Sequence, residues 1–267
     1  MGVVGGACGI RILKKLSPDG HGAFPDGVPL AYQDRTKLEV LLGADVWNLI
    51  RNKVVVDFGC GQGREVVELV ERGARHVFGI ELRQEWLDEA AALARARGVA
   101  DRCTFLERWT GGPSADVILS IDSFEHFDDP AGILKTMYGM LSPTGSVLAT
   151  FGPTWYHPYG GHLFSLFPWA HFVFTEHALV TWRATLPGKR PTTSFRETGL
   201  NQMTVKRFET LVAASPFEFA SFEAVPIRKV LWAANRLLRE FTTSIVRCRL
   251  VPRDAYTRSQ DARRVPA

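Results

Sequence analysis

Three alternating glycines directly follow an apolar run in the stretch VVVDFGCGQG. Glycine permits positive φ angles and lets the backbone approach a ligand closely. Two acidic side chains would flank this turn: Asp57 could hold a cationic or hydrogen-bonding group, and Glu81 could accept hydrogen bonds from both hydroxyls of a ribose. The pattern therefore predicts a site for a ribose-containing ligand, and the alternative is a plain tight turn with two solvated acids. The glycines are Gly59, Gly61 and Gly63.

The elements that would position these residues alternate between strands and helices. Apolar runs predict strands over 53–58, 76–81, 103–107, 116–122, 145–151, 217–226 and 242–252. Amphipathic runs predict helices over 36–50, 63–73, 84–98, 130–141 and 203–215. This order predicts an α/β, Rossmann-like doubly wound sheet of seven strands, with an antiparallel last strand and helices on both faces. Ligands of such sheets bind beyond the carboxyl ends of the strands, where the glycines fall.

A nicotinamide dinucleotide is the first alternative ligand, because its binding turn is also rich in glycine. That turn follows the pattern G-x-G-x-x-G, which would need a glycine at position 64. The residue there is Arg64. A nicotinamide-dependent oxidoreductase is therefore disfavoured, although it stays open as an alternative function.

Several motifs resemble those of the class I S-adenosylmethionine-dependent methyltransferases. VVVDFGCGQG is similar to their first motif, and GIE, which ends at Glu81, is similar to the part that carries their ribose-binding acid. ADVILSIDSFEHFDDP (115–130) and LSPTGSVLAT (141–150) resemble motifs of the small-molecule subgroup typified by ubiquinone-biosynthesis methyltransferases. The resemblance covers roughly residues 34–151. It implies that S-adenosylmethionine is the cofactor, held by Asp57, Gly59, Gly61, Gly63, Glu81 and Asp122.

Trp109 stands where the family often has an acidic residue near the adenine. We expect its ring to stack on the base. A catalytically silent S-adenosylmethionine-binding module would share all these donor residues, so that function is the second alternative to an enzyme.

Acceptor chemistry is predicted after the fourth strand, where the spacing D-x-x-E-H groups Asp122, Glu125 and His126. Methyl transfer needs an acceptor held in line, and a base if the acceptor carries a proton. We expect His126 to be such a base and Glu125 to contact the substrate. The same spacing resembles a motif for which a divalent metal is implicated, and oxygen ligands with one imidazole could hold Mg²⁺. Because Glu-His after this strand is widespread in the family, no metal ligand is predicted.

An aromatic segment follows the fifth strand, with eight aromatic residues and three histidines between positions 155 and 174. A rim over the active site would explain both residue types, since it needs apolar walls and a few polar anchors. We expect Trp155, Tyr156 and Tyr159 to wall the acceptor, and His157 and His162 to be further candidate bases. The alternative is additional core or an oligomer interface.

The acceptor class follows from motifs that are missing. The strand-four position reads SIDS rather than the N-P-P-Y-like tetrapeptide of many nucleic-acid methyltransferases, and no glutamate hairpin of protein-arginine enzymes is present. These observations favour a small-molecule, sugar or lipid-like acceptor, methylated at a hydroxyl. Nucleic acid is not an expected partner.

The net charge of +4 is unevenly distributed, because ten basic and three acidic residues lie between Arg228 and the end. Residues 227–241 read as a basic amphipathic helix, which leaves open a peripheral contact with an anionic membrane. No apolar run of about 18 residues appears, and the four cysteines form no CxxC pair. We expect a cytoplasmic protein with an N-terminal extension (1–33), a methyltransferase domain (34–252) with an insertion at about 152–200, and a basic tail (253–267).

Overall fold

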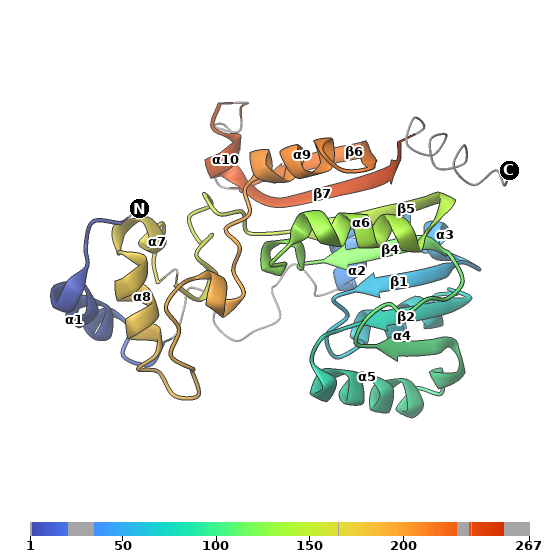
Figure 1. The fold of residues 1–267 in the computed structure, drawn as a ribbon, viewed down its shortest axis with the longest axis horizontal. Coiled ribbons are helices and arrows are strands. Elements are labelled where there is room, and N and C mark those ends of the chain that lie inside the picture. Colours follow the sequence, from blue (N-terminus) through green and yellow to red (C-terminus); the bar gives the residue numbers. More distant parts are fainter. Residues whose placement is uncertain (1, 21–34, 165, 229–234, 236, 254–267) are drawn as a thin grey trace, which may run out of the picture.

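The computed structural model describes residues 2–20, 35–164, 166–228, 235 and 237–253. Its centre is one seven-stranded sheet in the order β3-β2-β1-β4-β5-β7-β6 (Figure 1). The strands are β1 (Val54–Phe58), β2 (His76–Ile80), β3 (Cys103–Leu106), β4 (Ala115–Ile121), β5 (Leu141–Phe151), β6 (Phe217–Pro226) and β7 (Thr243–Pro252). The first five are parallel, and β7 runs antiparallel to both β5 and β6. This confirms the predicted Rossmann-like sheet with an antiparallel last strand.

Strand order reverses at β1, which pairs with β2 on one side and with β4 on the other. The chain moves outward from β1 to β3 and then returns to β4. The segments that follow β1, β2 and β4 therefore emerge beside one another at the carboxyl edge of the sheet.

Helices cover both faces of the sheet and build two apolar cores. One core is formed with α2 (Lys37–Leu42), α3 (Val46–Ile50), α4 (Arg64–Glu71) and α5 (Gln84–Ala96). The other is formed with α6 (Pro130–Met140) and α9 (Val205–Ala213). The short β3–β4 connection, 107–114, contains no helix, and Trp109 packs there against the second core.

A third apolar core lies beside the sheet and joins the N-terminal segment to residues 155–200. It unites α1 (Gly6–Leu16), which the sequence analysis did not predict, with α7 (Ala170–Val173) and α8 (Glu176–Arg183). Leu13 of α1 and Trp182 of α8 are fully buried in it. Figure 1 shows α1, α7 and α8 together at one end of the molecule. The segment expected as an active-site rim is thus largely a packed unit with its own interior.

Two predicted helices differ in the structure. The single helix expected over 36–50 is divided into α2 and α3, because Gly43 adopts a positive φ of 87° and ends α2. Of the helix expected over 227–241, the described residues 227, 228, 235, 237 and 238 are not in an α-helix, and α10 comprises only Arg239–Thr242. β7 begins directly afterwards at Thr243. Among the described residues, no helix is both long and apolar enough to span a bilayer.

Replacing Leu13 by Ala should destabilise the third core. Leu13 has no exposed surface, and truncating a buried leucine costs about 2 to 5 kcal/mol of unfolding free energy. The matched control is Leu16→Ala on the same helix, where the side chain is 57% exposed. Chemical denaturation should show a large loss for the first variant and a small change for the second. Equal losses would contradict this packing.

Candidate functional site

The largest described cavity, of about 890 Å³, opens at the carboxyl edge of the sheet. Its wall combines the turn after β1, the end of β2, the β3–β4 connection and the segment after β4. Six of the residues predicted for function lie together on it. They are Gly59, Gly61, Glu81, Trp109, Asp122 and His126.

The glycine turn is shaped by close contacts that exclude side chains. Gly59 has a φ of 93°, and a Cβ there would lie 2.6 Å from the Ser123 hydroxyl oxygen. Gly63 has a φ of 75°, and a Cβ there would lie 2.6 Å from the Cβ of Ala90 on α5. Gly59 thus brings the turn against the segment after β4, while Gly63 serves helix packing and is not on the cavity wall.

Glu81 directly follows β2, and its carboxylate is held by Arg83. The Oε1 atom accepts hydrogen bonds from the Arg83 backbone N–H at 3.1 Å and from Nε at 3.2 Å. The Arg83 guanidinium also lies over the Trp86 ring. No described residue donates to Oε2, so one carboxylate oxygen is available to a ligand in the cavity.

Acidic side chains surround one lysine on the cavity wall. Lys37 of α2 places its Nζ 3.0 Å from Asp122 Oδ2 and 3.8 Å from Glu65 Oε1. Asp122 has a strained φ of 52°. Asp57 is buried in β1, and burial, followed by the Glu65 charge, raises its pKa from 3.8 to about 8. This surplus of carboxyl groups favours a cationic ligand.

Trp109 contacts the sheet as well as the cavity. Its ring meets Phe78 edge to face, with centroids 5.4 Å apart. The indole therefore covers part of the sheet face that the helix-free β3–β4 connection leaves open. Trp109 also lines the cavity, and its contact with a base remains a prediction.

His126 and Glu125 stand side by side in a short 3-10 helix, yet their environments differ. The exposed His126 ring lies on the cavity wall, with Nδ1 2.7 Å from the Gly199 carbonyl oxygen. Because a carbonyl only accepts, Nδ1 carries the hydrogen and Nε2 is the basic nitrogen. Glu125 is 2% exposed and accepts from the Gly152 N–H, and burial raises its pKa to about 8. Glu125 therefore contacts the Gly152 backbone in the interior and does not line the cavity.

The histidines of the aromatic segment are mostly internal. Burial lowers the pKa values of His157, His162 and His171 to about 4. His157 accepts from the Tyr159 N–H, His171 bonds the Trp155 carbonyl, and His162 bonds the Pro153 carbonyl. Only His162 approaches a cavity residue: its ring centroid lies 5.5 Å from that of His126.

The three aromatic residues predicted to wall the acceptor do not line this cavity. Trp155 is 7% exposed and belongs to the third core. Tyr156 stacks on Phe172, with centroids 5.7 Å apart. Tyr159 is half-buried and its ring lies 6.0 Å from that of His157. Of the residues predicted for acceptor chemistry, only His126 lines this cavity.

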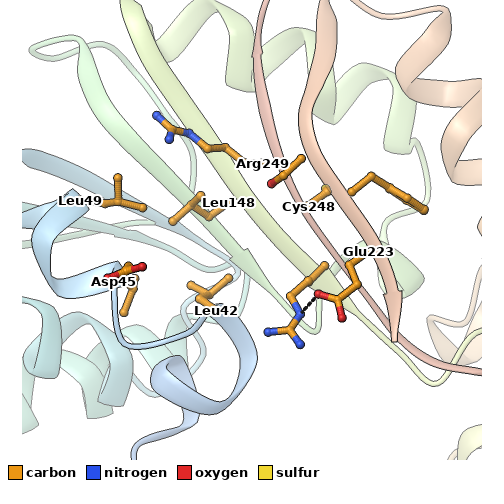
Figure 2. Close-up of a pocket in the computed structure, with 11 residues that line it drawn as sticks. Leu42, Asp45, Leu49, Leu148, Glu223, Cys248 and Arg249 are labelled. Atoms are coloured by element: carbon orange, nitrogen blue, oxygen red, sulfur yellow. Dashed lines mark ion pairs between the residues drawn. The ribbon is translucent and has the colours of Figure 1, made fainter. Parts of the chain in front are cut away.

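A second cavity, of about 410 Å³, lies on the sheet face between α2, α3 and β5–β7–β6 (Figure 2). Leu42, Leu49 and Leu148 line it, and an ion pair of 2.9 Å joins Arg247 to Glu223. None of the residues predicted for function faces it. Within the described ranges, no group of three or more His, Cys, Asp or Glu side chains is arranged to hold a metal ion.

Comparison with known proteins identifies the fold around the larger cavity. A family model described as "Methyltransferase domain" matches residues 56–149, which span β1 through most of β5. Over these residues the chain contains a methyltransferase domain. An S-adenosylmethionine-dependent methyltransferase from Mesorhizobium loti shares its fold, with a TM-score of 0.50, 19% identity and coverage of 76% of this chain and 92% of that one.

Sequence relatives of the methyltransferase domain differ in their acceptors. A ubiquinone biosynthesis O-methyltransferase from Neisseria meningitidis is 33% identical over 37% of this chain and 43% of its own length. A tRNA 5-carboxymethoxyuridine methyltransferase from Escherichia coli is 29% identical over 36% of this chain and 39% of its own length. The chain thus matches less than half of each relative.

Three residues on the cavity wall were not predicted from the sequence. Lys37 follows Thr36, whose capping box with Glu39 begins α2, and the T-x-x-E pattern could have located this helix start. Arg83 and Ser123 had no pattern of their own, because their roles depend on contacts with Glu81 and Gly59 that only the folded chain creates.

Glu81→Ala should weaken S-adenosylmethionine binding about tenfold to a hundredfold, since a charged acceptor for ribose hydroxyls contributes roughly 1.5 to 3 kcal/mol. Glu85→Ala is the matched control, because Glu85 is an exposed acid on α5 that does not line the cavity. Isothermal titration calorimetry measures both. Unchanged affinity in the Glu81 variant would contradict the assignment.

Asp57 should make the ligand-free protein less stable as pH rises. Its folded pKa of about 8 exceeds 3.8, the ordinary value, so between these values the folded state binds more protons and unfolding free energy falls with increasing pH. Asp57→Asn removes this titration, and its melting temperature should fall less between about pH 5 and pH 8. The exposed Asp45→Asn variant should behave like wild type. Identical pH profiles for all three proteins would refute the buried-carboxyl account.

Proposed function

We propose that this chain is a cytoplasmic S-adenosylmethionine-dependent methyltransferase that modifies a hydroxyl of a small-molecule, sugar or lipid-like acceptor. The observation that carries the proposal is the position of His126 on the wall shared with Gly59 and Glu81. A base and a donor cradle in one cavity are what transfer to a protonated acceptor requires. S-adenosylmethionine supplies the methyl group from a sulfonium that needs no further activation.

The cavity fits this donor in size, charge and hydrogen bonding. Glu81 offers Oε2 to the ribose, while the bare backbone at Gly59 and Gly61 allows the amino-acid part to approach. Asp122 and Glu65 provide negative charge for a cationic donor. Lys37 occupies this position in the ligand-free protein, so we expect its ammonium group to shift when a cation binds.

His126 would act as the general base through Nε2. The hydrogen bond from Nδ1–H to the Gly199 carbonyl fixes both the tautomer and the ring orientation. The His162 ring contacts the His126 ring, with centroids 5.5 Å apart. Because its lowered pKa keeps His162 neutral at physiological pH, it adds no positive charge beside His126. This arrangement favours proton removal from a hydroxyl placed at the cavity mouth.

The relatives support the donor more strongly than the acceptor. O-methyltransferase relatives agree with a hydroxyl acceptor, while the tRNA methyltransferase relative makes nucleic acid the main competing acceptor. Release of S-adenosylhomocysteine should therefore be screened with phenols, aliphatic alcohols, sugars and bulk tRNA. Turnover with tRNA alone would overturn the small-molecule proposal, and donor binding without any turnover would favour a silent binding module.

His126→Ala should lower turnover about 10²- to 10⁴-fold with an active acceptor from the screen, while donor affinity and melting temperature stay close to wild type. His177→Ala is the matched control, because His177 is exposed on α8 and lies outside the cavity. Steady-state kinetics and calorimetry provide the readouts. If the His126 variant keeps wild-type turnover, catalysis proceeds by positioning alone.

A further inference from the structure

Exposed large apolar side chains are concentrated at one end of the protein. Of the nine in the described chain, only Leu82 belongs to the cavity region. The other eight lie in the N-terminal segment, α7 and the α10 region. They are Val3, Ile12, Leu16, Trp169, Val173, Leu237, Leu238 and Phe241. Scattered exposed apolar residues need no explanation, but a one-sided group indicates a contact surface.

The segments that carry these side chains are connected by backbone hydrogen bonds and by Tyr156. The backbone N–H of Val3 donates to the Val173 carbonyl at 3.0 Å, and the Val173 N–H donates to the Trp169 carbonyl at 3.2 Å. Tyr156 bridges α7 and α10, because its ring stacks on Phe172 and lies 5.2 Å from the Phe241 ring. We call the exposed group Val3, Trp169, Val173, Leu237, Leu238 and Phe241 the α7–α10 surface.

Trp169 is held outward on this surface by local structure. Its φ of 60° is unusual for a bulky side chain, and its indole N–H donates to the Tyr156 carbonyl at 3.0 Å. The side chain nevertheless remains 40% exposed. Tryptophan has an apolar ring and one polar edge, a combination that suits the boundary between lipid and water.

Basic residues adjoin the α7–α10 surface. α1 follows Val3 in the chain and exposes Arg11, Lys14 and Lys15 without any acidic residue in the helix. Ile12 and Leu16 are exposed on the same helix. Figure 1 places α1, α7 and α10 along one outer edge of the molecule, at the end remote from α5. Apolar side chains beside exposed cations are complementary to anionic lipid.

We propose that the α7–α10 surface, together with α1, docks this protein on an anionic lipid bilayer. A second copy of the chain would fit less well, because the same cations would face each other across the contact. The surface includes α10 but differs from the basic helix expected over 227–241, of which 229–234 and 236 lie outside the described residues. If the proposed function holds, a lipid-like acceptor could be taken from this bilayer.

Co-sedimentation of the full chain with equimolar phosphatidylcholine and phosphatidylglycerol vesicles at low salt tests the proposal. Wild type should bind, and Val3→Ser/Leu237→Ser should bind at least about tenfold more weakly, since membrane affinity scales with buried apolar area. Both positions are about 90% exposed, so these changes should leave folding intact. Leu82→Ser is the matched control, because it removes an exposed apolar side chain elsewhere.

A second variant tests the electrostatic part. Arg11→Gln/Lys15→Gln should also weaken sedimentation about tenfold or more, because each surface cation contributes to attraction by anionic lipid. Donor affinity, measured by calorimetry, should stay unchanged in all variants on this surface, which separates membrane docking from the proposed activity. The proposal is overturned if wild type does not sediment, or if Val3→Ser/Leu237→Ser sediments like wild type.

Discussion

The pairing of β1 with both β2 and β4 is the constraint on which the site depends. Because the sheet grows in opposite directions from β1, three connecting segments that are distant in sequence meet at one edge. Gly59 allows the turn after β1 to pack closely against the segment after β4, because a side chain at this position would clash with Ser123. The strand order therefore creates the cavity. The strands β1, β2 and β4 position the side chains that follow them on its wall.

Carboxyl groups and one lysine determine the charge of this cavity. Several carboxyl groups converge where the backbone turns after β1, and the fold tolerates them by two means: Lys37 neutralises Asp122, and Asp57 keeps its proton until about pH 8. A protonated Asp57 costs less to bury than a charged one. We expect an incoming cation to compete with the Lys37 ammonium group for Asp122.

The sheet and the donor side could be predicted from the sequence because both depend on local patterns. Strand periodicity located β6 at 217–226, and the glycine spacing located the turn that lines the cavity. The acceptor side could not be predicted in the same way. Composition alone does not distinguish Trp155, buried in the third core, from a pocket wall. Nor does it reveal that α1 would complete that core, since this depends on contacts more than 150 residues apart, such as that of Trp182 with Ser17.

The three separate cores have an evolutionary consequence. Trp109 contributes to the sheet packing and to the cavity at once, so a change at this residue would affect stability and ligand binding together. Residues 155–200 instead pack largely among themselves and against α1. That unit can accumulate substitutions while the strands that hold the donor site stay intact. Related chains should therefore diverge fastest in this unit, without any change to the sheet.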